Sequence, residues 1–259
     1  MTAVTTRSRF SGRTALVTGG GSGLGRAMAL AFAAEGANVV VAGRTEGPLK
    51  ETVALIEGAG GTALAVTADV SRSADLAALV AAAVDRFGSL DVAVNNAGIL
   101  RAGQPVAELP EEDWRTMLDI NVTGVLLALQ AEVKQMRTQS TGGAIVNIGS
   151  TLGAHISVRG TAAYGATKAA VSALSRAAAA EHIRDGVRIN TVSPGSSDTT
   201  MSLRPGETEA ERAVRMKEST PLGRVSTTEE IAAAVLYLAS DESGSVVGAD
   251  LVIDGGAAA

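Results

Sequence analysis

The stretch Thr18-Gly19-Gly20-Gly21-Ser22-Gly23-Leu24-Gly25 follows a short apolar run, Thr14–Thr18, and leads directly into a helical pattern. Glycines let a backbone approach a phosphate closely, and the N–H groups that begin a helix supply donors and partial positive charge. The spacing is T-G-x-x-x-G-x-G, and no Lys-Ser or Lys-Thr pair follows as in a P-loop. We therefore expect a dinucleotide site here, with a glycine-rich turn of no further function as the alternative.

The rest of the chain repeats this order of strand and then helix. Most strand candidates are apolar throughout, as in strands that are buried on both faces of a parallel sheet. The pattern predicts an α/β fold, a single doubly wound Rossmann-type parallel sheet of about seven strands flanked by helices on both faces. The strand candidates are Thr14–Thr18, Asn38–Ala42, Ala63–Val66, Val92–Asn95, Ala144–Ile148, Arg188–Val192 and Asp250–Ile253. The helix candidates are Gly25–Glu35, Glu46–Glu57, Ser73–Phe87, Glu111–Arg137, Ala162–Arg184 and Thr228–Ser240.

No internal repeat or linker divides this pattern. We expect residues 1–11 to be a flexible N-terminal end and residues 12–259 to form one dinucleotide-binding and catalytic domain. The least regular segment, residues 194–222, is rich in proline and glycine and has a short helical pattern at Glu207–Lys217. Long irregular segments in compact domains are often lids over a site, so we expect residues 194–222 to be the substrate loop.

Composition argues against several classes of protein. The 259 residues carry a net charge of −5 and include one Trp, two Tyr and three Phe, which disfavours nucleic-acid partners. With no Cys and two distant histidines, His155 and His182, we expect neither disulfides nor a metal site. The first twelve residues lack the apolar core of a signal peptide, and no run of about 18 apolar residues indicates a membrane span. We therefore expect a cytoplasmic protein with no membrane partner.

The end of the second predicted strand bears on the choice of cofactor. NAD-binding sites usually place an acidic residue there for the ribose 2′-hydroxyl, but this chain has Gly43-Arg44. An arginine can pair with a 2′-phosphate, and the Ser22 hydroxyl could donate to the same group. NADP(H) is therefore favoured and NAD(H) stays possible, whereas a solvated loop arginine is the plainer interpretation. Asp69, at the end of the third strand, could receive an adenine amino group or could cap the segment that begins near Ser71.

Tyr164 and Lys168 are spaced to lie on one face of a helix. An ordinary phenol, with a pKa of about 10, is too weak an acid to act readily at neutral pH, and a nearby ammonium lowers that pKa. Tyr–Lys at this spacing is therefore a workable general acid/base pair. Ser150, which ends the fifth strand candidate, could donate to a substrate carbonyl or could simply cap the next segment.

These residues resemble the short-chain dehydrogenase/reductase family over almost the whole chain. The similarity rests on TGGGSGLG at 18–25, Asp69, Asn95-Asn96-Ala97-Gly98, Asn121 in Asn121-Val122-Thr123-Gly124, Ser150, Tyr164-x-x-x-Lys168, Ser193-Pro194-Gly195 with Thr199, and the tail Asp254-Gly255-Gly256. The resemblance implies an oxidoreductase that exchanges a hydride between a nicotinamide cofactor and a small-molecule carbonyl or secondary alcohol. It also implies chemistry without a metal and a homotetramer formed through the two long central helices.

The resemblance assigns a role to each matching residue. Tyr164 would be the acid in carbonyl reduction, Lys168 would lower its pKa and hold the nicotinamide ribose, and Ser150 would orient the carbonyl. Asn121 would hold a water in a proton relay from Lys168, while Asn95, Ala97 and Gly98 would shape the cofactor pocket. Thr199 would contact the carboxamide or phosphate end of the cofactor. The cofactor-binding candidates are Thr18, Gly19, Gly21, Ser22, Gly23, Leu24, Gly25, Arg44, Asp69, Val70, Asn96, Ala97, Gly98, Tyr164, Lys168, Pro194, Gly195 and Thr199.

The substrate is less well defined. The loops at 98–103, 153–160 and 193–201 are similar to those of the 2,3-dihydro-2,3-dihydroxybenzoate dehydrogenases, which use NAD. By that similarity Arg101 or Arg159 could pair with a carboxylate on a cyclic dihydrodiol, although both could be ordinary surface arginines. The 3-oxoacyl carrier-protein reductases and broad carbonyl reductases of the family fit equally well. A non-catalytic NADP(H)-binding protein is the alternative of another class, but it would not need Asn121, Ser150, Tyr164 and Lys168 together.

Overall fold

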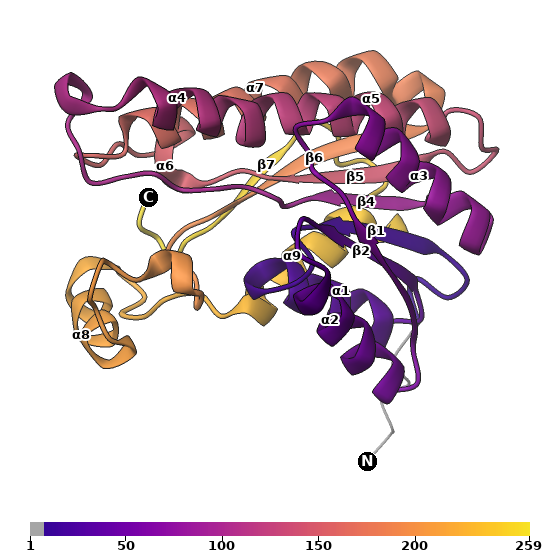
Figure 1. Cartoon of the computed structure of the whole chain (residues 1–259), viewed down its shortest axis with the longest axis horizontal. Coiled ribbons are helices and arrows are strands. Elements are labelled where there is room, and N and C mark those ends of the chain that lie inside the picture. The colour runs from indigo at the N-terminus through magenta and orange to yellow at the C-terminus, as the bar shows by residue number, and fades with distance from the viewer. Residues whose placement is uncertain (1–7) are drawn as a thin grey trace.

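The computed structural model describes residues 8–259, in which seven strands form one parallel sheet (Figure 1). The strand order is β3-β2-β1-β4-β5-β6-β7, which confirms the predicted doubly wound fold. The strands are β1 (Thr14–Thr18), β2 (Asn38–Gly43), β3 (Thr62–Thr67), β4 (Val92–Asn95), β5 (Gly143–Ile148), β6 (Val187–Pro194) and β7 (Asp250–Ile253).

The centre of the sheet is buried on both faces, and this explains the uninterrupted apolar runs. Leu16 of β1 pairs with Val40 of β2 on one side and with Ala93 of β4 on the other. The chain order reverses between β1 and β4, so the helices that follow these two strands lie on opposite faces. Ligands of such sheets bind in the crevice that this reversal opens at the carboxyl ends of the strands.

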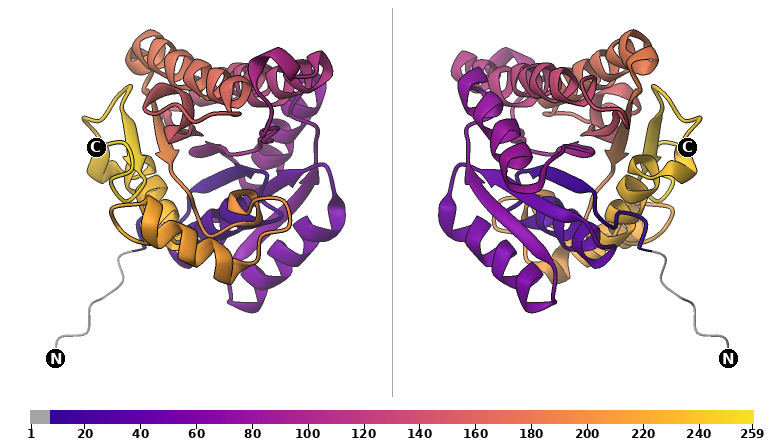
Figure 2. Two further views of the ribbon diagram at one scale, coloured as in Figure 1. Left: turned by 90° about the vertical axis from the view of Figure 1, so that its left-hand side faces the viewer. Right: turned by 90° about the vertical axis from the view of Figure 1, so that its right-hand side faces the viewer.

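Two layers of helices enclose the sheet, as Figures 1 and 2 show. One layer, α1 (Gly23–Ala34), α2 (Glu46–Gly58) and α9 (Thr228–Ala239), shares a core with β1 and β2 that includes Met28, Phe32 and Ile231. The other layer, α3 (Ser73–Phe87), α5 (Gly124–Met136) and α7 (Ala162–His182), packs around a second core with Leu79, Leu129 and Val171. These two layers of helices fix the ends of the strands, and the predicted site residues lie at those ends.

The predicted helix Glu111–Arg137 is interrupted. It consists of α4 (Glu111–Leu118), a π-helical turn η2 (Asp119–Thr123) and α5. A π turn adds a residue to one helical turn, and such turns often lie at functional sites. Here the turn carries Asn121, whose side chain bonds the chain after β4 rather than pointing to solvent. This contact is a tertiary one, so helical periodicity alone could not reveal the break.

The expected flexible end at 1–11 is not observed for the residues that the structure describes. Phe10 is fully buried, and its ring meets that of Phe32 edge-to-face with the centroids 4.9 Å apart. Arg9 forms an ion pair with Glu35 at the end of α1. The prediction is therefore wrong for residues 8–11, because an aromatic anchor fixes them to the core, and its remainder lies outside the described residues.

The irregular segment 194–222 is an ordered structure built from short elements. It contains the 3₁₀ turn η4 (Thr200–Ser202) and the helix α8 (Glu209–Ser219), which lies beyond the end of β6 (Figure 1). Thr208 and Glu211 form a capping box at the start of α8. The helix begins two residues later and ends two residues later than the predicted Glu207–Lys217. The remaining short elements are η1 (Val106–Glu108), α6 (Thr151–Ala154), η3 (Ile183–Asp185) and η5 (Asp241–Ser243).

One helical stretch, Glu111–Met136, is long and apolar enough to cross a membrane by length and composition alone. Its apolar side faces the second core, where Val125, Leu129, Val133 and Met136 pack against the sheet and α3. Core packing therefore accounts for its apolar character.

Candidate active site

Tyr164 and Lys168 lie together at the start of α7, as their spacing predicts. Both are buried, with 8% and 5% of their surface exposed. The Lys168 Nζ atom lies 5.8 Å from the centre of the Tyr164 ring and donates to the carbonyl oxygen of Ile148 at 2.8 Å. Ile148 is the last residue of β5, so the pair meets the sheet at the carboxyl edge where ligands bind.

Ser150 lies two residues after the end of β5 and is also buried. Its Oγ accepts a hydrogen bond from the backbone N–H of Leu152 at 3.1 Å and caps α6. The hydroxyl also lies close enough to the Tyr164 phenol to oppose the rise in its pKa. Ser150 can therefore cap α6 and also donate to a substrate carbonyl, since one hydroxyl can accept from the backbone and donate to another group.

Burial controls the protonation of the pair. It raises the pKa of Tyr164 to about 12, against the opposing hydrogen bond with Ser150. It lowers the pKa of Lys168 to about 8, because a buried ammonium loses its hydration. The sequence predicts a phenol whose pKa Lys168 lowers, but the structure gives one whose pKa is raised. Desolvation is the main cause of the raised pKa, and the Lys168 Nζ donates to Ile148 rather than to the phenol oxygen.

Asn121 joins the loop after β4 to α7, the helix that carries Tyr164 and Lys168. It is fully buried, its Oδ1 accepts from the N–H of Ile99 at 2.8 Å, and its Nδ2 donates to the Ile99 carbonyl at 2.9 Å. Nδ2 also donates to Thr167 Oγ1 at 3.1 Å, and that hydroxyl donates to the Tyr164 carbonyl at 2.7 Å. These contacts occupy the amide of Asn121, so any contact with a relay water falls to its main chain.

The glycine-rich loop fits a dinucleotide phosphate. The Ser22 side chain does not cap α1. The first backbone N–H groups of α1 are therefore left for a ligand in the crevice. Gly19 has φ of +67°, and a Cβ there would lie 2.7 Å from Asn96 Nδ2. A Cβ on Gly25 would overlap the Gly19 carbonyl oxygen. The turn therefore needs glycine both for its backbone angles and for its close packing.

The loop Asn95–Gly98 is bound tightly to this turn. Thr18 Oγ1 accepts from the N–H groups of Asn96 and Ala97 at 3.0 and 3.1 Å, and Asn96 Nδ2 donates to the Thr18 carbonyl at 2.9 Å. A Cβ on Gly98 would lie 3.2 Å from Asn121 Oδ1 and 3.6 Å from Lys168 Nζ. The loop thus lies between the glycine-rich turn and the candidate site residues Asn121 and Lys168.

Arg44 and Asp69 lie near each other at the ends of β2 and β3. Arg44 and Ser22 are exposed. Asp69 Oδ1 accepts from the backbone N–H and the hydroxyl of Ser71 at 3.0 and 2.7 Å. These bonds, with a smaller contribution from Arg44, lower the pKa of Asp69. Asp69 therefore closes a local turn with Ser71 and keeps its charged form beside Arg44, whereas the N-cap position of α3 is Arg72.

The remaining predicted cofactor residues contact the glycine-rich loop or lie close to it in the structure. A Cβ on Gly23 would lie 3.4 Å from Thr199 Cγ2, so the start of the segment 194–222 covers that turn. Gly195 follows Pro194 at the end of β6 and donates to Ile253 at 2.9 Å. Val70 lines a small cavity with Thr18 and Ala97, and Leu24 packs on the core of the α1 face.

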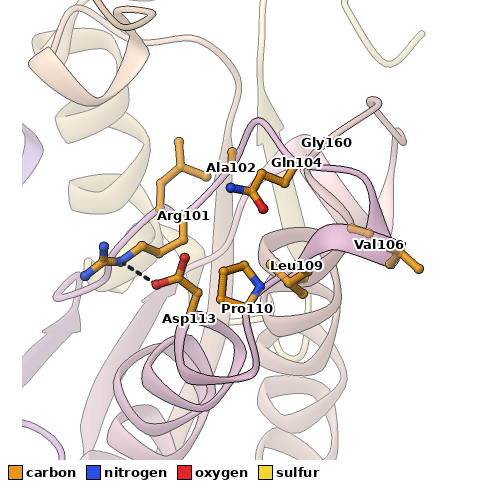
Figure 3. A pocket seen from close by; sticks show the side chains of 11 residues that line it. Arg101, Ala102, Gln104, Val106, Leu109, Pro110, Asp113 and Gly160 are labelled. Carbon is orange, nitrogen blue, oxygen red and sulfur yellow. Dashed lines mark ion pairs between the residues drawn. The ribbon is translucent and has the colours of Figure 1, made fainter.

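A cavity of about 270 Å³ lies between the loop that follows β4 and the start of α7 (Figure 3), and Tyr164 itself does not line it. It is lined by Arg101, Gln104, Leu109 and Asp113, and by Ala163, which packs with Tyr164 in a small apolar cluster. Arg101 and Asp113 form an ion pair with their nearest atoms 3.5 Å apart, at one side of the cavity in Figure 3. Arg159, the other candidate for a carboxylate, is exposed and does not line this cavity.

Two residues that hold the candidate site residues in place were not predicted from the sequence. Thr167 bridges Asn121 and Tyr164, and its signal was a hydroxyl next to Lys168 in an otherwise alanine-rich helix. Arg212 of α8 is 6% exposed and donates to the Thr199 carbonyl at 3.0 Å. No local pattern marks Arg212, because its partners are ten or more residues away. Within residues 8–259, no three His, Cys, Asp or Glu residues are grouped so as to hold a metal ion.

Comparison with known proteins agrees with this geometry. A family model described as enoyl-(acyl carrier protein) reductase matches residues 19–258. The chain is 40% identical to 2,5-dichloro-2,5-cyclohexadiene-1,4-diol dehydrogenase LinX of Sphingobium indicum, over 96% of this chain and 97% of that one. It is also 40% identical to cis-4-hydroxycyclohexanecarboxylate dehydrogenase of Sinomonas cyclohexanicum, over 95% and 97% of the two chains.

A solved structure supports the same relationship. The crystal structure of a short-chain type dehydrogenase/reductase from Mycobacterium marinum superimposes with a TM-score of 0.90 at 36% identity. The similarity covers 97% of each chain. The shared architecture therefore includes both the sheet and the loops that surround the site.

Proposed function

The chain belongs to the short-chain dehydrogenase/reductase family, and we propose that it interconverts a cyclic secondary alcohol and its ketone with NADP(H). Family membership makes it an NAD(P)-dependent oxidoreductase acting on CH–OH and C=O groups. The proposal adds the catalytic residues, the preferred cofactor and the substrate class. It rests most on one observation, the joint burial of Tyr164, Lys168 and Ser150 at the carboxyl end of β5.

We propose that Tyr164 is the proton donor in reduction. A nicotinamide ring supplies the hydride chemistry when bound, while the protein handles the proton. The Ser150 hydroxyl donates to the carbonyl oxygen and fixes its direction, and the Tyr164 phenol gives its proton to that same oxygen. In alcohol oxidation Tyr164 takes this proton back. A pKa of about 12 keeps the phenol protonated at neutral pH, which suits the reductive direction.

Lys168 and Asn121 support the proton donor in this proposal. Lys168 is anchored on Ile148 and would hold the ribose hydroxyls beside Tyr164. Asn121 fixes Ile99 and, through Thr167, the first turn of α7. These contacts hold the start of α7 at a fixed distance from the loop Asn95–Gly98, which is the geometry that proton and hydride transfer to adjacent atoms requires.

The preference for NADP(H) rests on the end of β2. Gly43 leaves no carboxylate for a ribose 2′-hydroxyl, and the exposed Arg44 lies beside the charged Asp69. A guanidinium that is free to turn can form a bidentate pair with a 2′-phosphate.

The substrate class rests on the cavity that Ala163, the residue before Tyr164, helps to line. Its volume of about 270 Å³ suits a single substituted ring, and two relatives are named for cyclohexadiene-diol and hydroxycyclohexanecarboxylate substrates. We propose that Arg101 receives a ring carboxylate by turning from Asp113, since more than half of the Arg101 side chain is exposed.

An activity panel tests the proposed function. NADPH and NADH are each followed by absorbance with cyclohexanone carboxylates, plain cyclohexanones and 3-oxoacyl thioesters, and the oxidised cofactors with the matching alcohols. We expect turnover of cyclic ketones, a preference for carboxylated ones, and loss of that preference in Arg101→Ala but not in Arg159→Ala. Turnover of 3-oxoacyl thioesters alone would overturn the substrate class, and turnover of no carbonyl or alcohol would overturn the proposal as a whole.

A further inference from the structure

Glu132 is a carboxyl group at a core position of α5. It is 1% exposed, in a buried stripe with Val125, Leu129, Val133 and Met136 at helical spacing. An ionised carboxylate in such surroundings is unfavourable unless several donors compensate it. Glu132 therefore needs either more donors or a proton.

One donor reaches the Glu132 carboxyl among the described residues. Asn95 Nδ2 donates to Glu132 Oε2 at 2.9 Å and also to Asn147 Oδ1 at 2.9 Å. Asn147 Nδ2 in turn donates to Ser175 Oγ at 2.8 Å. This chain of buried polar groups crosses α5, β4, β5 and α7, the elements that adjoin or carry the candidate site residues.

Two atoms of this network lack a partner within residues 8–259, and they lie at its Glu132 end. They are Glu132 Oε1 and Asn95 Oδ1, and both are acceptors when the carboxyl is ionised. The two planar groups are already joined through Nδ2 and Oε2. A single proton on Oε1 would provide the missing donor, because a carboxylic acid and an amide can pair through two parallel hydrogen bonds.

We propose that Glu132 is held protonated and that its Oε1–H donates to Asn95 Oδ1, closing an acid–amide pair between α5 and β4. Asn95 begins the loop Asn95–Gly98, which Thr18 ties to the glycine-rich turn and which packs on Asn121 and Lys168. Glu132 is thus a positioning residue for the cofactor side of the site, a consequence that rests on the proposed function.

The surroundings of Glu132 favour the protonated form. Burial raises its pKa to about 7, and the hydrogen bond from Asn95 opposes this rise. The neighbouring elements β4, β5 and α7 present the neutral groups Asn95, Asn147 and Ser175, and α3 presents aliphatic side chains such as Leu79. No charged group in the described part of the chain adds to the two influences on its pKa.

A direct measurement of the proton tests this proposal without any enzyme activity. Full-length protein labelled with ¹³C at glutamate carboxyls is titrated by NMR and infrared spectroscopy as wild type, Glu132→Gln and, as an exposed control on α2, Glu57→Gln. We expect one carboxyl that is protonated at pH 6, titrates near pH 7 and disappears only in Glu132→Gln. If every carboxyl titrates in its ordinary range, Glu132 is ionised and the proposal is wrong.

The stability of the same variants gives an independent readout. A pKa raised in the folded state stabilises the fold below the unfolded value of 4.5, and this stabilisation is lost as the pH rises through 7. Wild type should therefore lose Tm between pH 5 and pH 8 relative to Glu132→Gln, whose amide can donate to Asn95 Oδ1 at every pH. Parallel curves for the two proteins would contradict the acid–amide pair.

Steady-state kinetics show whether Glu132 positions the loop Asn95–Gly98 for the cofactor or only stabilises the fold. If only the protonated form holds the loop, the cofactor KM of wild type rises by up to about tenfold from pH 6 to pH 8, with kcat less affected. In Glu132→Gln the cofactor KM should stay flat, and Glu132→Ala should raise it at both pH values. A Gln variant as impaired as the Ala variant at pH 6 would refute positioning. Loss of all activity with the spectroscopic result intact would refute the proposed function instead.

Discussion

The pKa values of the two central residues of this site are set mainly by burial. Tyr164 and Lys168 are both nearly inaccessible, and burial moves the pKa of the phenol up and that of the amine down. The sequence placed these two residues correctly but predicted the wrong direction for the phenol. Spacing along a helix shows which side chains are neighbours, whereas the loss of hydration depends on everything packed around them.

The buried ammonium should make the fold less stable near neutral pH. Its pKa falls from 10.5 to about 8, so the unfolded chain binds the Lys168 proton more tightly and stability rises with pH between these values. Lys168→Met should therefore raise the free energy of unfolding at pH 7, by an amount on the order of 3 kcal/mol, and less at pH 10. Chemical denaturation at both pH values measures this, with the exposed Lys134→Met as control. Equal effects at the two pH values would contradict the lowered pKa.

Arg44 should decide the choice between cofactors. Arg44→Ala removes the proposed 2′-phosphate contact, which as a charge-assisted pair is worth roughly 1.5–3 kcal/mol, or about 10- to 100-fold in KM for NADPH. The KM for NADH should change little, and Arg115→Ala, at an exposed position on α4, should change neither. Steady-state kinetics with both cofactors provide the measurement. Equal effects on the KM values for NADPH and NADH would contradict a contact between Arg44 and the 2′-phosphate.

At the scale of elements, regular structure was predictable from the sequence and tertiary contacts were not. The bounds of β1, α3, β4 and β7 are those predicted, because apolar runs and the break at Gly88 are local signals. The π turn at Asn121 and the anchored Phe10 depend on contacts with Ile99 and Phe32, which are distant in sequence. The same reason hid Thr167, Arg212 and Glu132, although a glutamate in the apolar stripe of α5 was a visible signal.

The contacts of Arg212 should fix the position of α8 relative to Thr199. Arg212 donates to the Thr199 carbonyl at 3.0 Å and to Ser202 Oγ at 2.9 Å, and it pairs with Asp198. Arg212→Ala should release α8 and raise the KM of cofactor and substrate several-fold, with a small change in Tm because the main cores do not include α8. Lys217→Ala, exposed on the same helix, is the control. An unchanged KM for both ligands would show that the contacts of Arg212 have no part in binding.

At the scale of the molecule, the exposed side of the α5–α7 layer is the proposed surface for self-association. These two long helices lie together over one face of the sheet (Figure 1), and Leu126 on α5 is 40% exposed. If four chains assemble there, light scattering should give about four times the 26.0 kDa of one chain. Leu126→Glu would place like charges against one another and should shift the mass downward. A wild-type mass of 26.0 kDa would contradict the assembly.

The central claim is that Tyr164 supplies the proton in carbonyl reduction. Tyr164→Phe keeps the ring and removes only the phenol oxygen, so its turnover of the best substrate and its Kd for NADPH are measured side by side. General acid catalysis is typically worth 10²- to 10⁴-fold, and we predict a loss of kcat in that range with the Kd for NADPH nearly unchanged. A variant that retains most of its turnover while binding NADPH normally would contradict the assignment.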